Sequence, residues 1–431
     1  MNDRFLRACR REPVDATPVW FMRQAGRTFA EYRALRERFG ILELAKNPEL
    51  CAEVTLMPVR ALGVDAAVLY ADIMLPLEPL GVDLRIEPEV GPIIERPIRS
   101  LADVEALRPF DPGEVGFTLD AIRLVRRELE GRAGVIGFSG APFTLACYLI
   151  EGRPSRDYAI AKAFMYREPA AWHALMERLS AMAVAYLRAQ VDAGAQVVQL
   201  FDSWVGGLGP ADYVEYVQPY VRDIVRAMDG VPVILFGTGT AALLELIADC
   251  GSDLVGVDSR VSLADAWRRI GHDRGIQGNL DGARVLAGWE ATEAGARRIL
   301  AEAAGRPGHV FNLGHGVLPG SDPEILRRLV DFVHEETSRT AGVASAAGAA
   351  GAAGTAGTAG AAGTARATAG AAGTTTSTAG PTAGTAGTTT STAGPTAGAA
   401  GTPTSTAGPT AGAAGTPTST AGTAGTAGTT S

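Results

Sequence analysis

Short runs of almost continuous apolar residues alternate with longer amphipathic segments along residues 1–339 of this chain. Runs without polar alternation are typical of parallel β-strands that are buried on both faces of a sheet. Because parallel strands need a long crossover between them, usually a helix, the alternation restricts the chain to a few α/β architectures. We predict eight strands, at Pro18–Met22, Ala66–Tyr70, Gly134–Phe138, Gln196–Phe201, Val231–Phe236, Leu254–Val257, Gly275–Gln277 and His309–Asn312.

The segments between these strands carry apolar residues at helical spacing. Gly63, Gly194 and Gly251 follow three of them directly, and glycine is common just past the end of a helix. Residues Gly81–Arg99 break this pattern and predict an inserted β-hairpin, because apolar and polar residues alternate there. We predict helices at Pro48–Leu62, Thr118–Leu129, Glu168–Ala193, Pro210–Met228, Thr240–Cys250, Leu263–Ile270, Thr292–Ala304 and Pro323–Glu336.

Eight strands, each followed by helical sequence, predict a single (β/α)8 barrel of the TIM type, with an N-terminal helical extension and the inserted hairpin. The alternative is a doubly wound sheet, which would bring a glycine-rich dinucleotide-binding turn. Gly237-Thr238-Gly239 is only a fragment of such a turn, and a tight loop between a strand and a helix explains it equally well. The sequence therefore favours the barrel.

Residues 340–431 are a different material, composed almost wholly of Ala, Gly, Thr, Ser and Pro, with Arg366 as the only charged residue. The segment that begins at Ser377 recurs at Ser391 and Ser405, which is a period of 14 residues. Such a sequence has too little apolar surface to offset the entropy of an ordered chain, and its glycines disfavour helix. We predict a barrel domain over residues 1–339 and a disordered low-complexity tail over residues 340–431.

The composition also bears on where the protein works. No stretch approaches the ~18 uninterrupted apolar residues that a membrane-spanning helix needs, and the charged first residues predict no signal peptide. The four cysteines are widely spaced and form no C-x-x-C pair, which favours free thiols in a reducing compartment. We expect a soluble cytoplasmic protein with no nucleic-acid or membrane partner.

Polar residues follow the predicted strands. The C-terminal ends of barrel strands meet on one face, where enzymes with this fold hold their active sites. Convergence of many polar side chains on that face is hard to explain by stability alone and predicts a functional site. The polar residues that follow the strands are Arg23, Gln24, Arg27, Asp72, Ser139, Tyr148, Asp202, Ser203, Asp258, Asn279 and His315.

Several of these residues also have a purely structural explanation. Asp72 could cap a helix or form an internal ion pair, and Asp202 with Ser203 could cap the helix that follows. Tyr148 could be a core tyrosine whose hydroxyl is satisfied at an edge. His315 lies between glycines, where packing gives little reason for a histidine, so a functional role is favoured there.

Arg23, Arg27 and Arg36 form a positive cluster in a protein whose formal net charge is −8. Three guanidinium groups near the end of one strand would repel one another without an anionic partner. Guanidinium groups bind carboxylates and phosphates bidentately, so the cluster predicts a ligand that carries such groups. No two of the five histidines and four cysteines have metal-ligand spacing, so we expect no metal site.

Seven short motifs occur in order along the chain: Trp20-Phe-Met-Arg-Gln-Ala-Gly-Arg27, Tyr70-Ala-Asp-Ile73, Gly137-Phe-Ser-Gly-Ala-Pro-Phe-Thr144, Tyr148-Leu-Ile-Glu-Gly152, Gln199-Leu-Phe-Asp-Ser203, Gln277-Gly-Asn-Leu-Asp281 and Asn312-Leu-Gly-His-Gly316. Together they resemble the motifs of the uroporphyrinogen decarboxylase family. The resemblance covers residues 4 to about 337 and includes the loops that follow the predicted strands. The low-complexity tail is not part of the family pattern.

The resemblance implies decarboxylation of the four acetate side chains of uroporphyrinogen III to methyl groups, which gives coproporphyrinogen III in haem and chlorophyll biosynthesis. It also implies a homodimer and a carboxy-lyase that works without a cofactor. The eight carboxylates of this substrate supply the anion that the arginine cluster requires. By resemblance, the substrate-binding residues are Arg23, Gln24, Ala25, Gly26, Arg27, Arg36, Asp72, Tyr148, Phe201, Ser203 and His315, with Phe143 beside Phe201 as a second apolar wall.

Two of these residues are predicted to be catalytic. Loss of carbon dioxide from an acetate needs an electron sink at the attached ring carbon, and a pyrrole protonated on carbon is such a sink because it becomes a cationic iminium. A fixed carboxylate below the ring nitrogens stabilises that cation. In the family this carboxylate accepts hydrogen bonds from the pyrrole N–H groups, so we assign the role to Asp72. Arg23 is predicted to help deliver the proton through water, although a pKa above ~12 makes an arginine a poor acid.

Two other functions account for parts of the sequence. A corrinoid or thiol methyltransferase has the same barrel, but it needs a zinc site built from His and Cys, and no cysteine lies near His315 in the sequence. A non-catalytic scaffold whose repeat tail mediates assembly is the other hypothesis, and the complete set of site residues argues against it. Metal analysis and an activity assay separate these functions from the decarboxylase.

Overall fold

The computed structural model describes residues 2–26, 28–87 and 90–353. Its sheet has seven parallel strands, each paired with the next in chain order. The strands are β1 (Ala66–Val68), β4 (Gly134–Gly140), β5 (Val197–Asp202), β6 (Val233–Gly237), β7 (Leu254–Gly256), β8 (Gly275–Gln277) and β9 (His309–Val310). Apart from Phe201, which is half-buried, the residues of these strands are buried, as the continuous apolar runs predict.

An eighth segment closes the sheet into a barrel. Val19 forms a parallel bridge with Phe311, directly after β9. On its other side, the carbonyl of Val19 accepts a hydrogen bond of 2.8 Å from the backbone N–H of Asp65, directly before β1. The predicted strand Pro18–Met22 is therefore reduced to a single bridge at Val19, but it occupies the place that a first barrel strand requires. The prediction of a (β/α)8 barrel is confirmed.

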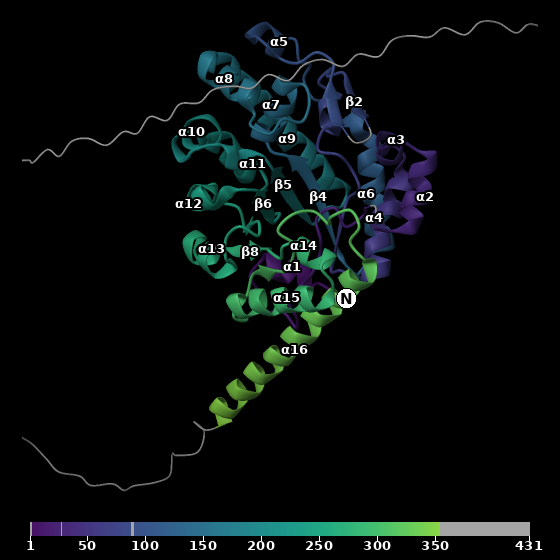
Figure 1. The fold of residues 1–431 in the computed structure, drawn as a ribbon, viewed down its shortest axis with the longest axis vertical. Coiled ribbons are helices and arrows are strands. Elements are labelled where there is room, and N and C mark those ends of the chain that lie inside the picture. Colours follow the sequence, from purple (N-terminus) through teal and green to yellow (C-terminus); the bar gives the residue numbers. More distant parts are fainter. Residues whose placement is uncertain (1, 27, 88–89, 354–431) are drawn as a thin grey trace, which may run out of the picture. The chain divides into compact units, whose positions relative to one another are not determined.

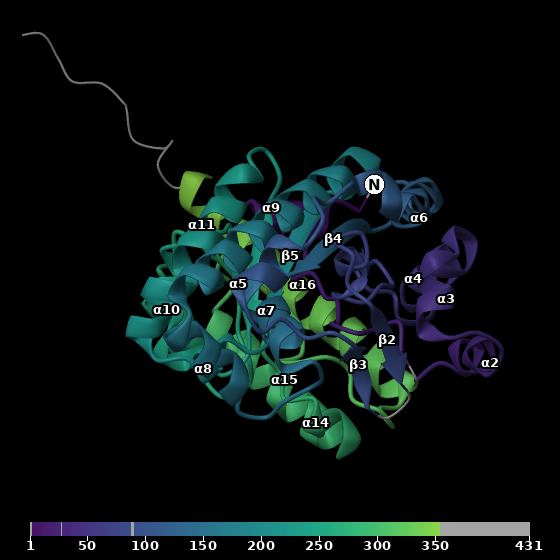
Figure 2. The ribbon, with the colours of Figure 1, turned by 90° about the horizontal axis from the view of Figure 1, so that it is seen from above.

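Helices surround the strands (Figures 1 and 2). They include the N-terminal helical extension, for which the sequence analysis gives no residue range. The helices are α1 (Arg4–Cys9), α2 (Ala30–Arg38), α3 (Ile41–Lys46), α4 (Pro48–Leu62), α5 (Leu101–Glu105), α6 (Gly116–Glu128), α7 (Pro142–Glu151), α8 (Ala159–Arg167), α9 (Pro169–Ala193), α10 (Pro210–Tyr216), α11 (Gln218–Ala227), α12 (Leu244–Ala248), α13 (Leu263–Ile270), α14 (Ala283–Leu286), α15 (Trp289–Ala303) and α16 (Pro323–Ala353).

Helix α4 has both of its predicted bounds, and its ends show why. The side chain of Asn47 accepts a hydrogen bond of 2.9 Å from the N–H of Leu50, and Pro48 occupies the first helical position, where no N–H is needed. At the other end Gly63 adopts a left-handed conformation with φ of +71°. These local signals fix the helix without help from the rest of the fold.

One predicted helix is in fact two. The segment Pro210–Met228 divides into α10 and α11 at Val217, whose backbone is not helical (φ −133°, ψ −51°). Pro219 lies in the first turn of α11 and has no backbone N–H, so a continuous helix through this point would lose a hydrogen bond. The apolar period continues across the break, which explains why the sequence pattern does not reveal it.

The inserted hairpin is confirmed. Strands β2 (Leu84–Glu87) and β3 (Gly91–Ile94) pair in antiparallel fashion and form a separate two-stranded sheet. The N–H of Ile94 donates a 2.9 Å hydrogen bond to the carbonyl of Gly152, directly after α7. The hairpin is thereby attached beside the helix that follows β4.

Helix α16 extends beyond its predicted end at Glu336 and reaches Ala353. The first part of the segment predicted to be disordered is thus helical. Alanine has the highest intrinsic helix propensity, and a helix that is already nucleated can be extended at low cost, even through residues that would not start one. The rest of the predicted tail, from residue 354, lies outside the described residues. Across residues 2–26, 28–87 and 90–353, no helix has both the length and the apolar character needed to cross a membrane.

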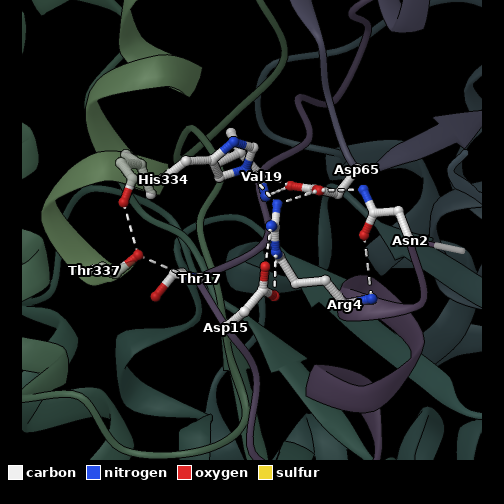
Figure 3. Close-up of polar contacts among 9 residues, drawn as sticks. Asn2, Arg4, Asp15, Thr17, Val19, Asp65, His334 and Thr337 are labelled. Carbon is white, nitrogen blue, oxygen red and sulfur yellow. Dashed lines mark hydrogen bonds and ion pairs between the residues drawn. The ribbon is translucent and has the colours of Figure 1, made fainter. Parts of the chain in front are cut away.

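A polar cluster around the buried side chain of Asp65 connects both ends of the barrel sequence (Figure 3). We call it the Asp65 cluster; it consists of Asn2, Arg4, Val19, Asp65 and His334. Asp65 is 1% exposed, and its carboxylate accepts from the Asn2 amide and the Arg4 guanidinium at 3.0 Å, and from the Val19 N–H at 2.8 Å. The His334 imidazole lies 2.7 Å from its second oxygen. Burial raises the pKa of Asp65, but the hydrogen-bond partners, with His334 first among them, outweigh this effect and lower the pKa below its ordinary value.

Candidate functional site

The site lies at the C-terminal ends of the strands, opposite the Asp65 cluster, because Asp65 directly precedes β1 and the predicted site residues follow the strands. The charge of Arg23 acts on three of these predicted site residues. Asp72, Tyr148 and His315 follow β1, β4 and β9 respectively. Burial raises the pKa values of Asp72 and Tyr148 and lowers that of His315, and the positive charge of Arg23 acts on all three in the lowering direction. The structure therefore brings these four residues together.

Arg23 lies in a turn that is fastened to the loop after β9. The N–H of Met22 donates to the side chain of Asn312 at 3.2 Å, and the N–H of Val317 donates to the carbonyl of Met22 at 2.8 Å. A Cβ atom at Gly316 would come within 2.6 Å of the Arg23 Cδ, so glycine makes room for the arginine stem. Arg23 is exposed and has no hydrogen bond or ion pair with any described residue, so its guanidinium is open to a ligand.

Gln24 holds the same turn from inside. It is 1% exposed, its Nε2 donates to the carbonyl of Ala66 at 2.9 Å, and its Oε1 accepts from the N–H of Phe21 at 3.0 Å. The side chain that the sequence predicts at the substrate is thus occupied by the protein backbone. Gln24 fixes the position of Arg23 relative to β1.

Ala25 and Gly26 are half-buried in this turn, and Arg27 lies outside the described residues. A Cβ atom at position 26 would approach the carbonyl oxygen of Arg23 to 2.9 Å. A larger residue at Gly26 would therefore displace the backbone that positions Arg23. The N–H of Gly26 donates to the carbonyl of Gln24 at 3.0 Å, which tightens the turn further.

Asp72 is half-buried just after β1. One carboxylate oxygen, Oδ1, accepts a 2.9 Å hydrogen bond from the backbone N–H of Met74, and the other has no hydrogen-bond partner in the described part of the chain. Burial raises the pKa of Asp72, while the Met74 hydrogen bond and the charge of Arg23 act in the opposite direction. A carboxylate with one open oxygen beside a cation is suited to stabilise a positive charge on a ligand.

Tyr148 projects from α7 toward these charges. It is half-buried, and burial followed by the negative charge of Asp72 raises its pKa, whereas Arg23 lowers it. Its ring lies 4.0 Å from the ring of Trp204, measured between centroids. Tyr148 is therefore a protonated hydroxyl at neutral pH, able to donate one hydrogen bond.

His315 is exposed between Gly314 and Gly316. Partial desolvation, and after it the positive charges of Arg23 and Arg260, lowers its pKa, while the charge of Asp258 opposes the shift. His315 is consequently neutral at physiological pH and offers one donor and one acceptor nitrogen to a ligand.

Arg36 lies on α2, and its guanidinium donates to the carbonyl of Phe39. Its charge reaches Tyr70, where it opposes the larger effect of burial, which raises the tyrosine pKa. Tyr70 lies two residues before Asp72, so the Arg36 charge acts near the end of β1. Arg36 and Arg23 belong to different elements, Arg36 to α2 and Arg23 to the turn that is bonded to the loop after β9.

Phe201 and Ser203 follow one another at the end of β5, and both are half-buried. The Phe201 ring lies between Phe138 and Phe236, with centroids 5.5 and 6.0 Å away. The carbonyl of Ser203 accepts a 2.5 Å hydrogen bond from the Thr238 hydroxyl, and the Ser203 side-chain hydroxyl has no hydrogen bond with any described residue.

The structure corrects the prediction for Phe143. This ring is fully buried and packs on Trp172 of α9, at 6.0 Å between centroids. It belongs to the layer between helices and cannot form a wall of the site. Phe143 lies in the first turn of α7, and the sequence alone does not show which side of that turn faces the core.

Sequence reasoning did not find Thr144 and Trp204, although both lie within or next to quoted motifs. The hydroxyl of Thr144 donates to Asp202 at 2.7 Å and accepts from the backbone N–H of Trp204 at 3.2 Å. Asp202 is buried, which raises its pKa to about 7 against the opposing effect of the Thr144 hydrogen bond. Since β5 and α7 are distant in sequence, no local pattern could have paired these residues.

The zinc site that the methyltransferase hypothesis requires can be checked in the side chains. Within the ranges that the structure describes, no three His, Cys, Asp or Glu residues are grouped so that they could hold a metal ion. The four cysteines are all buried and unpaired.

The comparisons with known proteins agree with the family resemblance of the sequence motifs. A family model described as uroporphyrinogen decarboxylase matches residues 1–336. A uroporphyrinogen decarboxylase from Roseiflexus sp. is 55% identical over 342 residues, covering 78% of this chain and 98% of the relative. The protein of that name from Sorangium cellulosum is 55% identical over 337 residues, covering 78% and 96%, and the one from Streptomyces coelicolor is 54% identical over 337 residues, covering 78% and 95%.

A solved structure with the same fold is a methyltransferase from Methanosarcina mazei. It has a TM-score of 0.66 and 19% identity, and the match covers 78% of this chain and 98% of that one. At this identity the likeness concerns the architecture of the barrel.

Proposed function

The chain belongs to the uroporphyrinogen decarboxylase family, and from this premise we propose which of its residues carry the reaction. The reaction is the removal of carbon dioxide from the four acetate side chains of uroporphyrinogen III, giving coproporphyrinogen III in tetrapyrrole biosynthesis. The observation that carries the proposal is the open carboxylate oxygen of Asp72, placed at the strand ends within reach of the Arg23 charge.

Asp72 is the catalytic carboxylate of the proposal. Its open oxygen accepts hydrogen bonds from the pyrrole N–H groups of the substrate. When a ring carbon is protonated, the ring becomes a cation, and as the carbon–carbon bond to the carboxylate breaks, its electron pair moves into the ring and carbon dioxide leaves. The methylene group that remains then takes up a proton to become the methyl group, and the ring carbon releases the proton that it had gained. A fixed negative charge stabilises the cation more than the neutral ring, so the stabilisation is larger in the transition state than in the bound substrate.

Arg23 has two functions in the proposal. Its open guanidinium binds a substrate carboxylate, and it helps to deliver the proton to the ring through a bound water molecule. Because the pKa of an arginine is above ~12, the guanidinium itself keeps its proton and the water is the donor. The support for placing Arg23 at the substrate is that its guanidinium has no partner among the described residues and that its charge acts on both Asp72 and Tyr148.

The remaining contacts orient the macrocycle. Arg27 and Arg36 bind further carboxylates, while the backbone at Ala25 and Gly26 lies beside them. The side chains of Tyr148, Ser203 and His315 supply hydrogen bonds to the acetate and propionate groups, and Phe201 is an apolar wall for the rings. Gln24 contributes by fixing the turn, because its own side chain is bonded to Phe21 and Ala66.

Replacing Arg36 by alanine should raise KM for uroporphyrinogen III about 10- to 100-fold and leave kcat within about twofold. The substitution removes one charge-assisted hydrogen bond to a carboxylate that is present in substrate and transition state alike, which is worth about 1.5–3 kcal/mol. Steady-state kinetics under anaerobic conditions measure both constants. Arg38→Ala is the matched control, because Arg38 is an exposed cation on the same helix. A fall in kcat at unchanged KM would contradict simple carboxylate binding.

The proposal extends to the organisation of the protein. We infer a homodimer in the cytoplasm, a catalytic domain over residues 1–339 and an appended tail over residues 340–431. The support is the family match, which ends at residue 336, and the composition of the following segment.

A chain truncated after Ala353 should convert uroporphyrinogen III to coproporphyrinogen III with the kcat and KM of the full chain. Every residue placed in the site, and all of the family match, precede the cut. The measurement is anaerobic incubation followed by chromatography of the oxidised porphyrins, in which the number of carboxyl groups falls from eight to four. Heat-denatured protein is the control. Loss of turnover on truncation would show that the tail belongs to the catalytic unit.

A further inference from the structure

Trp204 lies between two tyrosines beside the site. Its ring is 4.0 Å from Tyr148 and 4.6 Å from Tyr158, with interplanar angles of 35° and 23°. Tyr158 is in turn fitted against Gly207, where a Cβ atom would approach its ring to 3.3 Å. The Tyr148 ring is thus the inner member of a three-ring stack whose outer member is fixed by the protein.

The backbone of Trp204 is fixed independently of its ring. Its N–H donates to the Thr144 hydroxyl at 3.2 Å, and that hydroxyl donates to Asp202 at 2.7 Å. A hydroxyl has one donor hydrogen, so the bond to the carboxylate leaves its lone pairs free to accept from Trp204. Thr144 is fully buried and Asp202 is 3% exposed, so this arrangement is shielded from solvent.

Thr144 and Tyr148 are four residues apart on α7 and therefore lie on the same face of that helix. Trp204 contacts both, with its backbone N–H on the first and its ring on the second. The loop that carries Trp204 also packs closely against the backbone of Thr238, because a Cβ atom at Gly206 would come within 2.2 Å of the Thr238 carbonyl oxygen. Two elements distant in sequence thus meet at one indole.

We propose that Trp204 is a positioning residue for the decarboxylation: held by Thr144 and Asp202 through its backbone, its ring sets the orientation of Tyr148 beside Asp72 and Arg23. The inference rests on the proposed role of Tyr148 at the substrate. A tyrosine attached only by its own side-chain torsions samples several rotamers, and the stack restricts it to the one that directs its hydroxyl into the site.

The test is a double-mutant cycle on kcat/KM for uroporphyrinogen III. Trp204→Leu should lower kcat/KM roughly 3- to 12-fold, which is the fold-change that corresponds to losing the interaction energy of one aromatic pair. In a Tyr148→Leu background the same substitution should change kcat/KM by less than about twofold, because the ring that it orients is absent. Trp204→Phe, which keeps an aromatic ring at this place, should recover most of the loss.

A second pair of variants tests the hydrogen bond between the Thr144 hydroxyl and the backbone of Trp204. Thr144→Val removes the hydroxyl at nearly constant volume and should reproduce the effect of Trp204→Leu, whereas Thr144→Ser should be close to wild type. Thermal unfolding of every variant identifies any that has lost its fold. If Thr144→Val or Trp204→Leu does not fold, the conservative variants Thr144→Ser and Trp204→Phe still test the proposal. Loss of activity in Thr144→Ser or Trp204→Phe, both folded, would overturn the proposal.

Additive effects in the cycle would also overturn it, since they would show that Trp204 acts on the substrate directly and not through Tyr148. If Tyr148→Leu alone leaves kcat/KM unchanged, the proposed function of Tyr148 fails, which is a separate outcome. A measurable Tyr148→Leu effect combined with additivity rejects the positioning role alone.

Discussion

The Asp72→Asn variant is expected to bind uroporphyrinogen III but to turn it over about 10²- to 10³-fold more slowly than the wild type. Asparagine keeps an oxygen that can accept from the Met74 N–H, so the local hydrogen bond survives. It lacks the negative charge that stabilises a cationic ring, and removal of one such electrostatic contribution costs kcat by about this factor. Anaerobic kinetics with separate determination of kcat and KM provide the measurement.

Two further observations separate this role from a structural one. Burial raises the pKa of Asp72, so its ionised form is disfavoured in the folded protein, and Asp72→Asn should unfold at the same temperature as the wild type or higher. The acid limb of the wild-type kcat/KM profile, which reports the free enzyme, should lie above 3.8, the ordinary pKa of an aspartate, because only the ionised carboxylate stabilises the cation. Unchanged turnover in the variant would reject the assignment of Asp72.

The Asp65→Ala variant is expected to lose about 3–5 kcal/mol of stability, the usual cost of removing one partner of a buried ion pair. The substitution leaves the buried Val19 N–H without its acceptor and removes one of the two carboxylates that pair with Arg4. Urea unfolding of the chain gives the free energy difference. Asp15→Ala is the matched control: Asp15 also pairs with Arg4, but its side chain is 70% exposed, so the expected loss is below about 1 kcal/mol.

The pH dependence has a definite sign. The pKa of Asp65 is lowered in the folded state, so its contribution is present above the ordinary value of 3.8 and is lost as the pH falls from there through the folded pKa. Wild-type stability should therefore decline in this acid window, and the Asp65→Asn variant should lack that part of the decline. Equal acid slopes for the two proteins would show that the cluster does not carry the effect.

The barrel could be predicted from sequence because each strand is a continuous apolar run and several helices carry their own end signals. Helix α13 illustrates this: Ser262 caps it by accepting from the N–H of Asp265 at 3.1 Å, and both of its predicted bounds are confirmed. Where the end signals are weak, prediction is poorer. Helices α7 and α8 have no predicted counterpart, since α7 is buried on nearly all sides and shows no polar period.

The site divides in the same way. The polar residues that follow the strands could be proposed because barrel topology gathers strand ends on one face. Which side chains are open could not be read from spacing: Gln24 faces backbone groups and Phe143 faces the helical layer, although both lie within site motifs. Contacts such as Thr144 with Asp202, which join residues 58 apart in sequence, depend on the folded chain.

The closure of the barrel at Val19 has a consequence for the nascent chain. Arg23 leaves the ribosome early, yet the turn that presents it is held by Asn312 and Val317, which are made nearly three hundred residues later. Pairing over so long a stretch of chain is slow and waits until the last strand has been synthesised. Products of interrupted translation that end before residue 309 therefore cannot assemble the carboxylate-binding turn, and competence for the substrate arises in one late step.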